Sequence, residues 1–429
     1  MAVAYGTDGI NYDLGAEGNN LLAMLQSIFK HNEEATDKES PSNVSAPEPK
    51  TKWNDAELIP PEALVMIGNG FDLECGLPTS YMDYLNFLSA VDHISTGKSC
   101  EGLPLNLSVK KNLFDKTADI TQWQPLTENY WYQHFKKAHI KLGWVDFENE
   151  IAKVIRTIEN SIDLNLFRPA TMDDCVSGMI KSDLTNTMGD LLKSFGIKSK
   201  QRIKGGGKYV EYNLLYRDLR DYLLNDLNAL VRGLEAYLRE FVEPLPINIT
   251  KNIIDLVKSI SQSDRRYVVS FNYTTTFERL LNTVGVDAKF CYVHGKIGDG
   301  KSKNKMVLGI GEYLIPNGVK NLIGFAPFRK YNQRIYKETN SDYMDWLHHI
   351  RTTNYNRMLY IFGHSLGITD KDIIEPFVRD EKVKTKVYYH DEDSFSDKVG
   401  NLTAMIGMDE MIHRTGGSYR SMEFVKQTH

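Results

Sequence analysis

Residues 66–81 read MIGNGFDLECGLPTSY, and this stretch follows a short apolar run that begins at Leu64. An apolar run that ends at a glycine is typical of a buried parallel strand entering a turn. Helical spacing begins near Tyr81, and the Pro, Thr and Ser at 78–80 are helix start signals. The stretch therefore predicts a strand, a glycine turn and a helix, which is the building unit of an α/β fold.

Further strand-like runs follow, with helical patterns between several of them, at residues 267–272, 289–294, 358–362 and 386–390. Alternation of this kind predicts a parallel sheet. Ligands of open parallel sheets bind beyond the carboxyl ends of the strands. We therefore predict an α/β protein with a Rossmann-like parallel sheet, whose candidate site lies in the residues directly after each strand.

The spacing of apolar residues also divides the chain. Residues 105–262 predict a large helical insertion, so that residues 61–104 and 263–429 form the Rossmann-like nucleotide-binding domain. Residues 1–60 combine a short amphipathic helix pattern, at 21–29, with a flexible linker rich in Pro, Ser and charge. This N-terminal helix either packs on its own domain, associates with a second copy, or docks a partner protein.

One segment of the insertion, KSKQRIKGGGKYV from Lys198 to Val210, combines basic residues with three consecutive glycines. Consecutive glycines are unfavourable in helices and central strands, so the segment predicts a loop. Two roles stay open for it, contact with a phosphate or a solvated surface.

Composition excludes several classes of protein. The chain has 51 Lys and Arg against 56 Asp and Glu, a formal net charge of −5, so nucleic acid is not indicated as a partner and neither is a membrane. It has no signal-peptide pattern and no apolar stretch of about 18 residues, so a cytoplasmic location is expected. The four cysteines form no CxxC pair, so no zinc ribbon or disulfide framework is indicated and no metal is predicted.

The first candidate segment is the glycine turn itself. Gly68 and Gly70 would let backbone amides approach an anionic group closely. The spacing is not that of a dinucleotide fingerprint, because Leu73 stands where GxGxxG needs glycine. Polar residues cluster around the turn and have to be solvated or bound to something, namely Asn69, Asp72, Thr79 and Ser80.

Two further segments follow predicted strands. In VVSFNYTTTFERLL, Asn272 ends a strand, and the three threonines after Tyr273 either cap a helix or belong to a site. In FCYVHGK, His294 ends a strand and Gly295 allows a sharp exit. An imidazole with a pKa of about 6.5 can accept a proton near neutral pH, so His294 is the best single candidate for acid–base work.

The fourth segment, LYIFGHSLGITDKDI, ends a strand at Gly363 and then places an imidazole, a hydroxyl and a carboxylate at the same sheet edge: His364, Ser365 and Asp370. GHSLG matches the GxSxG nucleophile elbow of serine hydrolases. That reaction needs an acid and then a histidine downstream, and only His390 and His413 lie far enough along the chain, neither in a recognisable setting.

Together, IGNGFD with GLPTSY, SFNYT, VHG and IFGHSLGITD resemble the bacteriophage abortive infection AbiH family over roughly residues 64–390. WVDFE, at 144–148, looks like the acidic motif of that family's helical part, or is a helix start capped by Asp146. The pattern is also similar to the sirtuin-like NAD-binding fold. GNG and GLP have the spacing of its GAG and GIP elements, and the later segments match its NID-type, HG and GxS motifs.

The resemblance implies an anti-phage effector that binds NAD and hydrolyses it to nicotinamide and ADP-ribose. It implies Asn272 and His294 as catalytic residues. It implies ligand contacts at Gly68, Asn69, Gly70, Phe71, Asp72, Pro78, Thr79, Ser80, Tyr273, Gly363, His364, Ser365 and Asp370. Thr274 replaces the acidic residue of the NID-type motif and the zinc-binding cysteines of protein deacylases are absent, so protein deacetylation is not expected.

Two other functions remain as alternatives. The same pocket would serve a non-catalytic NAD or ADP-ribose sensor that signals through the N-terminal helix to a defence partner. Alternatively, Asp72, His294, His364 and Asp370 would serve an effector that cleaves nucleotides or nucleic acid, although they show no metal-ligand spacing.

Overall fold

The computed structural model describes residues 4–5, 11–12, 62–115, 122–137, 144–163, 175–181, 200–204, 207–311, 323–339, 341–353, 357–418 and 420–428. The predicted helix at 21–29 and the linker after it lie outside these residues. Two short strands near the start of the chain, β1 (Ala4–Tyr5) and β2 (Asn11–Tyr12), pair antiparallel.

The chain forms two compact units. Unit 1 consists of Met1–Leu77, Pro244–Val293 and Asn340–His429, and unit 2 consists of Pro78–Glu243 and His294–Thr339. Unit 2 takes in the chain from Pro78, and a second segment that begins at His294 belongs to it.

Unit 1 is built on a six-stranded sheet with the order β11-β10-β9-β3-β7-β8, in which every pair of neighbours is parallel. Its strands are β3 (Glu62–Ile67), β7 (Arg265–Ser270), β8 (Lys289–Tyr292), β9 (Arg357–Phe362), β10 (Val383–Tyr389) and β11 (Met422–Lys426). The predicted α/β class with a parallel sheet is confirmed, and β11 is an additional edge strand.

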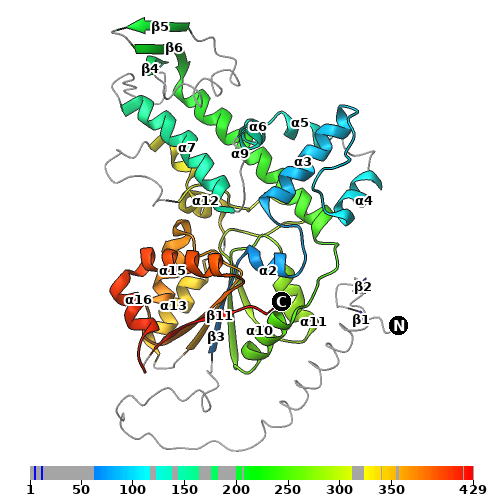
Figure 1. Ribbon diagram of the computed structural model, residues 1–429, viewed down its shortest axis with the longest axis vertical. Coiled ribbons are helices and arrows are strands. Elements are labelled where there is room, and N and C mark those ends of the chain that lie inside the picture. The colour runs from blue at the N-terminus through cyan, green and yellow to red at the C-terminus, as the bar shows by residue number, and fades with distance from the viewer. Residues whose placement is uncertain are drawn as a thin grey trace, which may run out of the picture. The chain divides into compact units, whose positions relative to one another are not determined.

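Helices cover both faces of this sheet (Figure 1). One face shares a continuous apolar core with α13 (Tyr343–Thr352), α14 (Lys371–Val378), α15 (Glu392–Ile406) and α16 (Met408–Thr415). The other face carries α10 (Lys251–Ser261) and α11 (Thr276–Thr283). All six residues of β3 are buried, because a strand covered on both faces has no solvated side.

Unit 2 contains mostly helices: α3 (Tyr81–Ser95), α4 (Leu107–Asp115), α5 (Gln124–Thr127), α6 (Tyr130–Lys137), α7 (Trp144–Asp163), α9 (Tyr216–Tyr237), η3 (Leu238–Val242), η5 (Ile323–Phe328) and α12 (Lys330–Lys337). The predicted start of α3 is confirmed. The Ser80 hydroxyl accepts a hydrogen bond from the Asp83 amide at 3.1 Å, and the Asp83 carboxylate accepts one from the Ser80 amide at 2.9 Å. This reciprocal pair is a capping box.

Unit 2 also holds a three-stranded antiparallel sheet with the order β4-β6-β5, formed by β4 (Cys175–Lys181), β5 (Lys200–Lys204) and β6 (Gly207–Leu215). The loop predicted for residues 198–210 is therefore wrong where that segment is described, because β5 and β6 pair there and Lys204 stands opposite Gly207. Glycines between two strand-like runs are compatible with a hairpin turn as well as with a loop.

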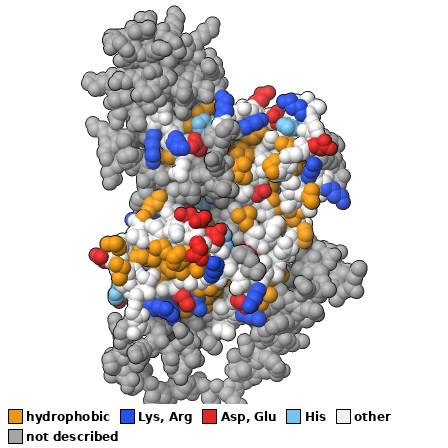
Figure 2. Space-filling view, viewed as in Figure 1, with side chains coloured by type: hydrophobic (Ala, Val, Ile, Leu, Met, Phe, Trp, Pro, Cys, Tyr) orange, Lys and Arg blue, Asp and Glu red, His pale blue; other side chains and the backbone are white. Residues whose placement is uncertain are grey.

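Hydrophobic side chains gather on the surface of unit 1 over α15 and α16 (Figure 2). On α16, Met408 and Ile412 are about one helical turn apart and are 65% and 62% exposed. Exposed apolar patches of this kind accompany interaction sites in soluble domains.

A buried ion-pair cluster joins the amino ends of the central strands of unit 1. Glu62, at the start of β3, is 2% exposed and accepts hydrogen bonds from Arg357 of β9 and from the His349 ring of α13 at 2.9 Å. Arg357 is 1% exposed. Burial by itself raises the pKa of Glu62, but the hydrogen bonds and charges of Arg357 and His349 bring it below its ordinary value.

Glu62→Gln is expected to lower the free energy of unfolding at pH 7 by roughly 3–5 kcal/mol, because it leaves the buried Arg357 guanidinium without its carboxylate. The pKa of Glu62 is lowered on folding, so its stabilisation is complete above about pH 4.5 and is lost as the pH falls through the folded-state value. The difference between wild type and variant should therefore shrink in acid, as measured by urea unfolding at pH 7 and pH 4.

Glu375→Gln is the matched control, because Glu375 pairs with Arg379 along one helix face and both side chains are partly exposed. Its loss should cost less than about 1 kcal/mol. Equal losses for the two variants would contradict the role given to the buried cluster.

Candidate functional site

The central strands of unit 1 end at one level of the sheet. Ile67 of β3 pairs with Ser270 of β7 and with Phe362 of β9, and Ser270 pairs with Tyr292 of β8. Two residues beyond this row, each strand is followed by a polar residue that the sequence had predicted for the site: Asn69, Asn272, His294 and His364. The register thus explains why four segments far apart in the sequence share one pattern.

Two glycine turns pack directly on each other at the ends of β3 and β9. The Gly68 amide donates to the Phe362 carbonyl at 3.0 Å, and the Gly70 amide donates to the Gly363 carbonyl at 2.8 Å. A Cβ on Gly70 would lie 2.8 Å from the Gly363 Cα, and one on Gly363 would lie 2.2 Å from the Phe71 nitrogen. The close packing of the two turns is enough to explain why glycine stands at these positions. The predicted approach of their amides to a phosphate stays a prediction.

The helix that follows the first turn, α2 (Asn69–Glu74), is fixed by two buried side chains. The Phe71 ring packs edge-on against Phe277, with 5.0 Å between ring centroids. Asp72 is 1% exposed, and its carboxylate accepts a hydrogen bond from the Thr274 hydroxyl at 2.5 Å. Asp72 and Thr274 thus tie α2 to the turn after β7, and a direct role of Phe71 or Asp72 on a ligand stays a prediction.

Two polar atoms at this edge are buried without a hydrogen-bond partner among the residues that the structure describes. They are the amide nitrogen Nδ2 of Asn69, at the start of α2, and the amide oxygen Oδ1 of Asn272, after β7. A buried donor or acceptor without a partner costs about 1–3 kcal/mol, so such atoms need an explanation. One is a donor and the other an acceptor, which together suit a ligand rich in hydroxyl groups.

His364 has a fixed orientation in the turn after β9. Its Nδ1 accepts a hydrogen bond from the Leu366 amide at 2.8 Å, so the proton of the neutral ring is on Nε2. That Nε2 lies 3.6 Å from an Asp370 carboxylate oxygen, and the ring packs on Phe271 with 4.2 Å between centroids. The structure therefore brings His364 and Asp370 together, as the sequence predicted for this edge.

Ser365 does not have the geometry of a nucleophile elbow. In an elbow the serine itself occupies the strained turn between strand and helix. Here the left-handed residues are Gly363, with φ 70°, and Leu366, with φ 59°, on either side of the exposed Ser365. The chain then continues through a short 3₁₀ turn, η6 (Ile368–Asp370), before α14 begins. The serine hydrolase alternative has no support in this geometry.

The other residues predicted for the site lie in different units. Tyr273 is 3% exposed in unit 1, whereas Pro78, Thr79, Ser80 and His294 belong to unit 2. The Pro78 carbonyl accepts a hydrogen bond from the Tyr237 hydroxyl at 2.9 Å. Thr79 is buried, and its hydroxyl has no hydrogen-bond partner in the described part of the chain.

His294 begins the second segment of unit 2, while Asn272 lies in unit 1. The strand before His294 ends at Tyr292, two residues earlier than the end at 294 that the sequence predicted. His294 is 6% exposed, and its carbonyl accepts a hydrogen bond from the Val307 amide at 2.8 Å. Gly295 makes the predicted sharp turn, with φ 72° and no room for a Cβ beside the Lys305 carbonyl, 2.2 Å away. Joint action of Asn272 and His294 stays a prediction.

Comparison with known families decides the relationship. The family model described as bacteriophage abortive infection AbiH matches residues 64–390, about three quarters of the chain. The chain belongs to the AbiH family. It is accordingly an abortive-infection protein of anti-phage defence. A search of curated proteins finds no match. The AbiH match contains every predicted site residue, from Gly68 to Asp370.

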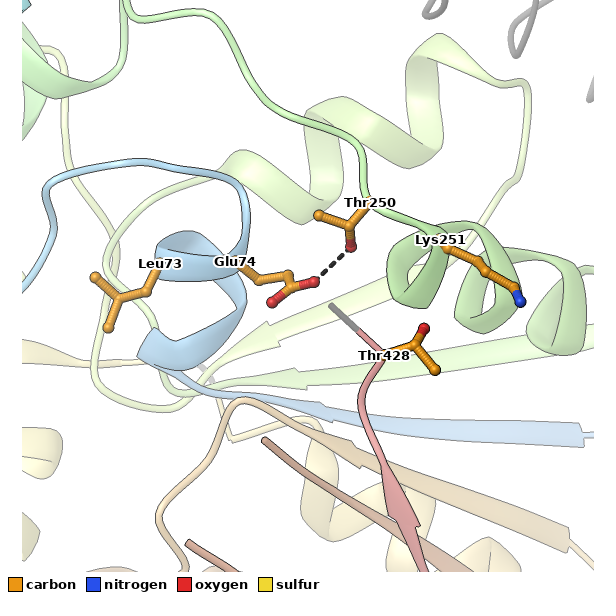
Figure 3. Close-up of a pocket in the computed structure, with 5 residues that line it drawn as sticks. All are labelled: Leu73, Glu74, Thr250, Lys251 and Thr428. Carbon is orange, nitrogen blue, oxygen red and sulfur yellow. Dashed lines mark hydrogen bonds between the residues drawn. The ribbon is translucent and has the colours of Figure 1, made fainter. Parts of the chain in front are cut away.

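The AbiH chain also has a cavity that the sequence did not predict. It has a volume of about 590 Å³ and lies in unit 1, lined by Leu73, Glu74, Thr250, Lys251 and Thr428 (Figure 3). The Glu74 carboxylate accepts hydrogen bonds from the Thr250 hydroxyl at 2.6 Å and from the Asn252 amide at 2.9 Å. None of the predicted site residues lines it, and no motif in the sequence marks it.

No group of three or more His, Cys, Asp or Glu side chains is arranged to hold a metal ion within the described ranges. In the same ranges, none of the helices has the length and apolarity to cross a membrane.

Two residues of α15 hold the turn that carries His364 and Ser365. The Lys398 amine donates to the His364 carbonyl at 2.6 Å, and the Asn401 side chain donates to the Ser365 carbonyl at 3.0 Å. Lys398 is 7% exposed, and burial lowers the pKa of its amine to about 8. Both residues lie beyond the segment that matches the AbiH model, so no family motif indicated them.

Gly363→Ala is expected to destabilise the protein by more than the cost of a left-handed alanine alone. Gly285→Ala is the control, because Gly285 has a similar φ of 74° and no atom lies within 4 Å of the position that a Cβ would occupy, so it should cost about 1–2 kcal/mol. Gly363→Ala adds the collision with Phe71 and should cost at least about 1–3 kcal/mol more. Thermal and urea unfolding measure both, and equal costs would contradict the packing of the two turns.

Lys398→Met is expected to change the pH dependence of stability. The pKa of Lys398 falls from 10.5 in the unfolded chain to about 8 on folding, so the unfolded state binds more protons between these values. Wild-type stability should therefore rise between pH 8 and pH 10.5 relative to Lys398→Met, by roughly 3 kcal/mol in total, and the difference should stay constant below pH 7.

Asn401→Ala removes the neighbouring contact without removing a titrating group, so its difference from wild type should not change with pH. Urea unfolding at several pH values measures both variants. A flat difference for Lys398→Met would show that its amine is not desolvated.

Proposed function

We propose that this AbiH protein binds NAD at the carboxyl edge of the unit 1 sheet and hydrolyses its nicotinamide–ribose bond. The observation that carries the proposal is the pair of buried amide atoms, Asn69 Nδ2 and Asn272 Oδ1, that lack partners among the described residues. They lie two residues beyond paired positions of neighbouring strands, where ligands of parallel sheets bind.

A ribose fits this pair chemically. Each ribose hydroxyl can donate one hydrogen bond and accept others, so one sugar can satisfy an amide donor and an amide oxygen together. Satisfying both atoms removes a penalty of roughly 1–3 kcal/mol for each, which adds to the affinity of a ligand that supplies the partners. An apolar ligand would gain nothing from these atoms.

The reaction follows from the same groups. Water adds to the anomeric carbon of the ribose, the carbon–nitrogen bond breaks, and its electron pair leaves with neutral nicotinamide. The proton of the attacking water goes to a base, and His294 is the predicted base. Because nicotinamide leaves as a neutral molecule, no general acid is needed. Asn272 orients the ribose or the water through its amide.

An abortive-infection protein has to stop growth of the infected cell, and loss of NAD would do so. The alternative sensor uses the same buried amides for binding without turnover. The alternative effector that cleaves nucleotides or nucleic acid has less support, because the Asp72 carboxylate already binds the Thr274 hydroxyl inside unit 1.

Purified protein is expected to release nicotinamide from NAD, directly or after addition of lysate from phage-infected cells. Asn272→Ala and His294→Ala should each lower the rate by about 100-fold or more, because each removes a group that acts on the reacting centre. Liquid chromatography of nicotinamide and ADP-ribose measures the reaction. Protection of the fold by NAD without any turnover would favour the sensor, and neither protection nor turnover would exclude NAD.

Binding can be separated from stability with two asparagines of unit 1. Asn272→Ala should abolish thermal protection by NAD while lowering the stability of the free protein little, since its Oδ1 makes no hydrogen bond to described residues. Asn252→Ala removes bonds to Glu74 and Thr428 and should lower stability by about 1–3 kcal/mol while NAD still protects. The opposite pattern would contradict the proposed site.

A further inference from the structure

The second segment of unit 2, His294–Thr339, is strongly cationic in a chain that is acidic overall. It contains nine Lys and Arg against three Asp and Glu, a formal charge of +6. The whole chain has a formal charge of −5, so its remainder carries −11. The net charge, which gave no reason to expect a nucleic-acid partner, therefore conceals a local concentration of positive charge.

Most of this charge lies on the surface. Lys330 is buried and pairs with the Glu148 carboxylate at 2.7 Å, and Arg329 is buried as well. The described carboxylates of the segment, Asp299 and Glu338, are exposed. The first part of the segment carries four exposed lysines, namely Lys296, Lys301, Lys303 and Lys305. These lysines alone outnumber the two exposed carboxylates.

Three cations from different parts of unit 2 lie close together: Arg232 of α9, Lys303 of the loop after His294, and Lys337 of α12. The pKa of Lys337 is lowered to about 8, chiefly by burial and also by the charges of Lys303 and Arg232. The carboxylate of Glu235 opposes this shift. In the described chain, none of the three cations forms an ion pair with a carboxylate. A bound anion would relieve the repulsion between them.

Hydrogen bonds attach the loop that carries these lysines to two helices of unit 2. The Glu235 carboxylate of α9 accepts hydrogen bonds from the Gly298 amide at 2.9 Å and from the Asn304 side chain at 2.8 Å. The Gln333 side chain of α12 donates to the Leu308 carbonyl at 2.7 Å and accepts from the Leu308 amide at 3.1 Å. The loop is therefore fixed to both α9 and α12.

An exposed aromatic ring belongs to the same surface. Tyr336 of α12 is 70% exposed, and the Lys303 amine lies 4.1 Å from the centre of its ring. Lys303 covers one face of the ring, and the other face is open to solvent. Lys337 is the next residue along α12, and its amine donates to the Met306 carbonyl of the loop. Lys303 and Lys337 thus lie at neighbouring positions on either side of the contact between loop and helix.

We infer that a surface of unit 2 made by Arg232, Lys303, Tyr336 and Lys337, here called the α12 surface, binds single-stranded nucleic acid. Its cations bind phosphates, and the open face of the Tyr336 ring stacks on a base. A single strand fits better than a duplex, because the bases of a duplex are stacked on each other and offer no face to the ring. An anionic membrane fits less well, because Ile335 is the one aliphatic side chain among the exposed hydrophobic residues of α12.

The inference does not depend on NAD hydrolysis, because the proposed NAD site uses none of these four residues. The test uses the full chain and fluorescein-labelled single-stranded DNA and RNA of about 20 nucleotides, with fluorescence anisotropy at two salt concentrations. The double variant Arg232→Glu with Lys303→Glu, at two exposed positions, should weaken binding by about tenfold or more. It should also lower the slope of log affinity against log salt by at least about 1, since each phosphate contact on a single strand contributes about 0.7.

Matched variants separate local charge from net charge and from folding. Lys98→Glu with Lys111→Glu changes the net charge equally at exposed positions of unit 2 outside the α12 surface and should leave binding within about twofold. The neutral pair Arg232→Gln with Lys303→Gln replaces the charge reversal if that variant does not give a wild-type thermal unfolding curve.

Stacking is tested at Tyr336. Tyr336→Ala should weaken binding roughly 5- to 150-fold with an unchanged salt slope, because it removes stacking rather than charge. Tyr336→Phe keeps the ring and should bind within about twofold of wild type. A duplex of the same sequence should bind more weakly than either strand.

Salt-dependent binding that is weakened by the changes at Arg232, Lys303 and Tyr336 and retained in the controls would establish the α12 surface. Absence of binding by the wild-type chain, equal losses in the control pair, or wild-type binding by Tyr336→Ala would overturn the inference. Binding to vesicles of phosphatidylcholine and phosphatidylserine in equal parts, without binding to either oligonucleotide, would also overturn it and assign the surface to an anionic membrane. NAD protection measured on the same variants keeps this outcome separate from that of the proposed function.

Discussion

The architecture of unit 1 depends on the contact between two glycine turns, one after β3 and one after β9. The Gly70 amide reaches the Gly363 carbonyl at 2.8 Å, and a Cβ at either position would collide with the opposite backbone. This contact joins the ends of two neighbouring strands that are almost 300 residues apart in the sequence, and it fixes the direction in which α2 leaves the sheet. This contact positions Asn69 and His364, because each is the second residue after its strand.

The buried polar groups at the two ends of the central strands differ in whether they have hydrogen-bond partners. At the amino ends, Glu62 and Arg357 are buried together, and the Glu62 carboxylate has hydrogen-bond partners in Arg357 and His349. At the carboxyl ends, Asn69 Nδ2 and Asn272 Oδ1 are buried without partners in the described chain. A protein stabilised only by its own contacts would gain by replacing either amide with an apolar group. The amino ends therefore form a structural cluster, whereas the carboxyl ends carry the unsatisfied groups on which the proposed ligand site rests.

The sequence was sufficient for those parts of the structure that local chemistry decides. The apolar run before Gly68 is a buried strand, and the Ser and Asp of the PTSYMD stretch begin a helix, because strand burial and capping are properties of neighbouring residues. The motifs also indicated which residues follow the strands. The register, the tie between Asp72 and Thr274 and the unsatisfied amides depend on residues about 200 positions apart, which no local pattern contains. The β5–β6 hairpin did not follow from the sequence for another reason, because consecutive glycines fit both a loop and a hairpin turn.

The least predictable part of the candidate site is its support from α15. Burial disfavours the charged amine of Lys398 and lowers its pKa to about 8. A lysine at this position therefore stabilises the fold poorly. An apolar side chain would pack there at lower cost, but it would leave the His364 carbonyl without the hydrogen bond that the amine supplies. Asn401 does the same for the next carbonyl, so two consecutive peptide groups of the turn are fixed from outside the segment that defines the family. His364 is thus oriented through its ring by the Leu366 amide and through its backbone by Lys398 of α15, and both contacts are made within the protein itself.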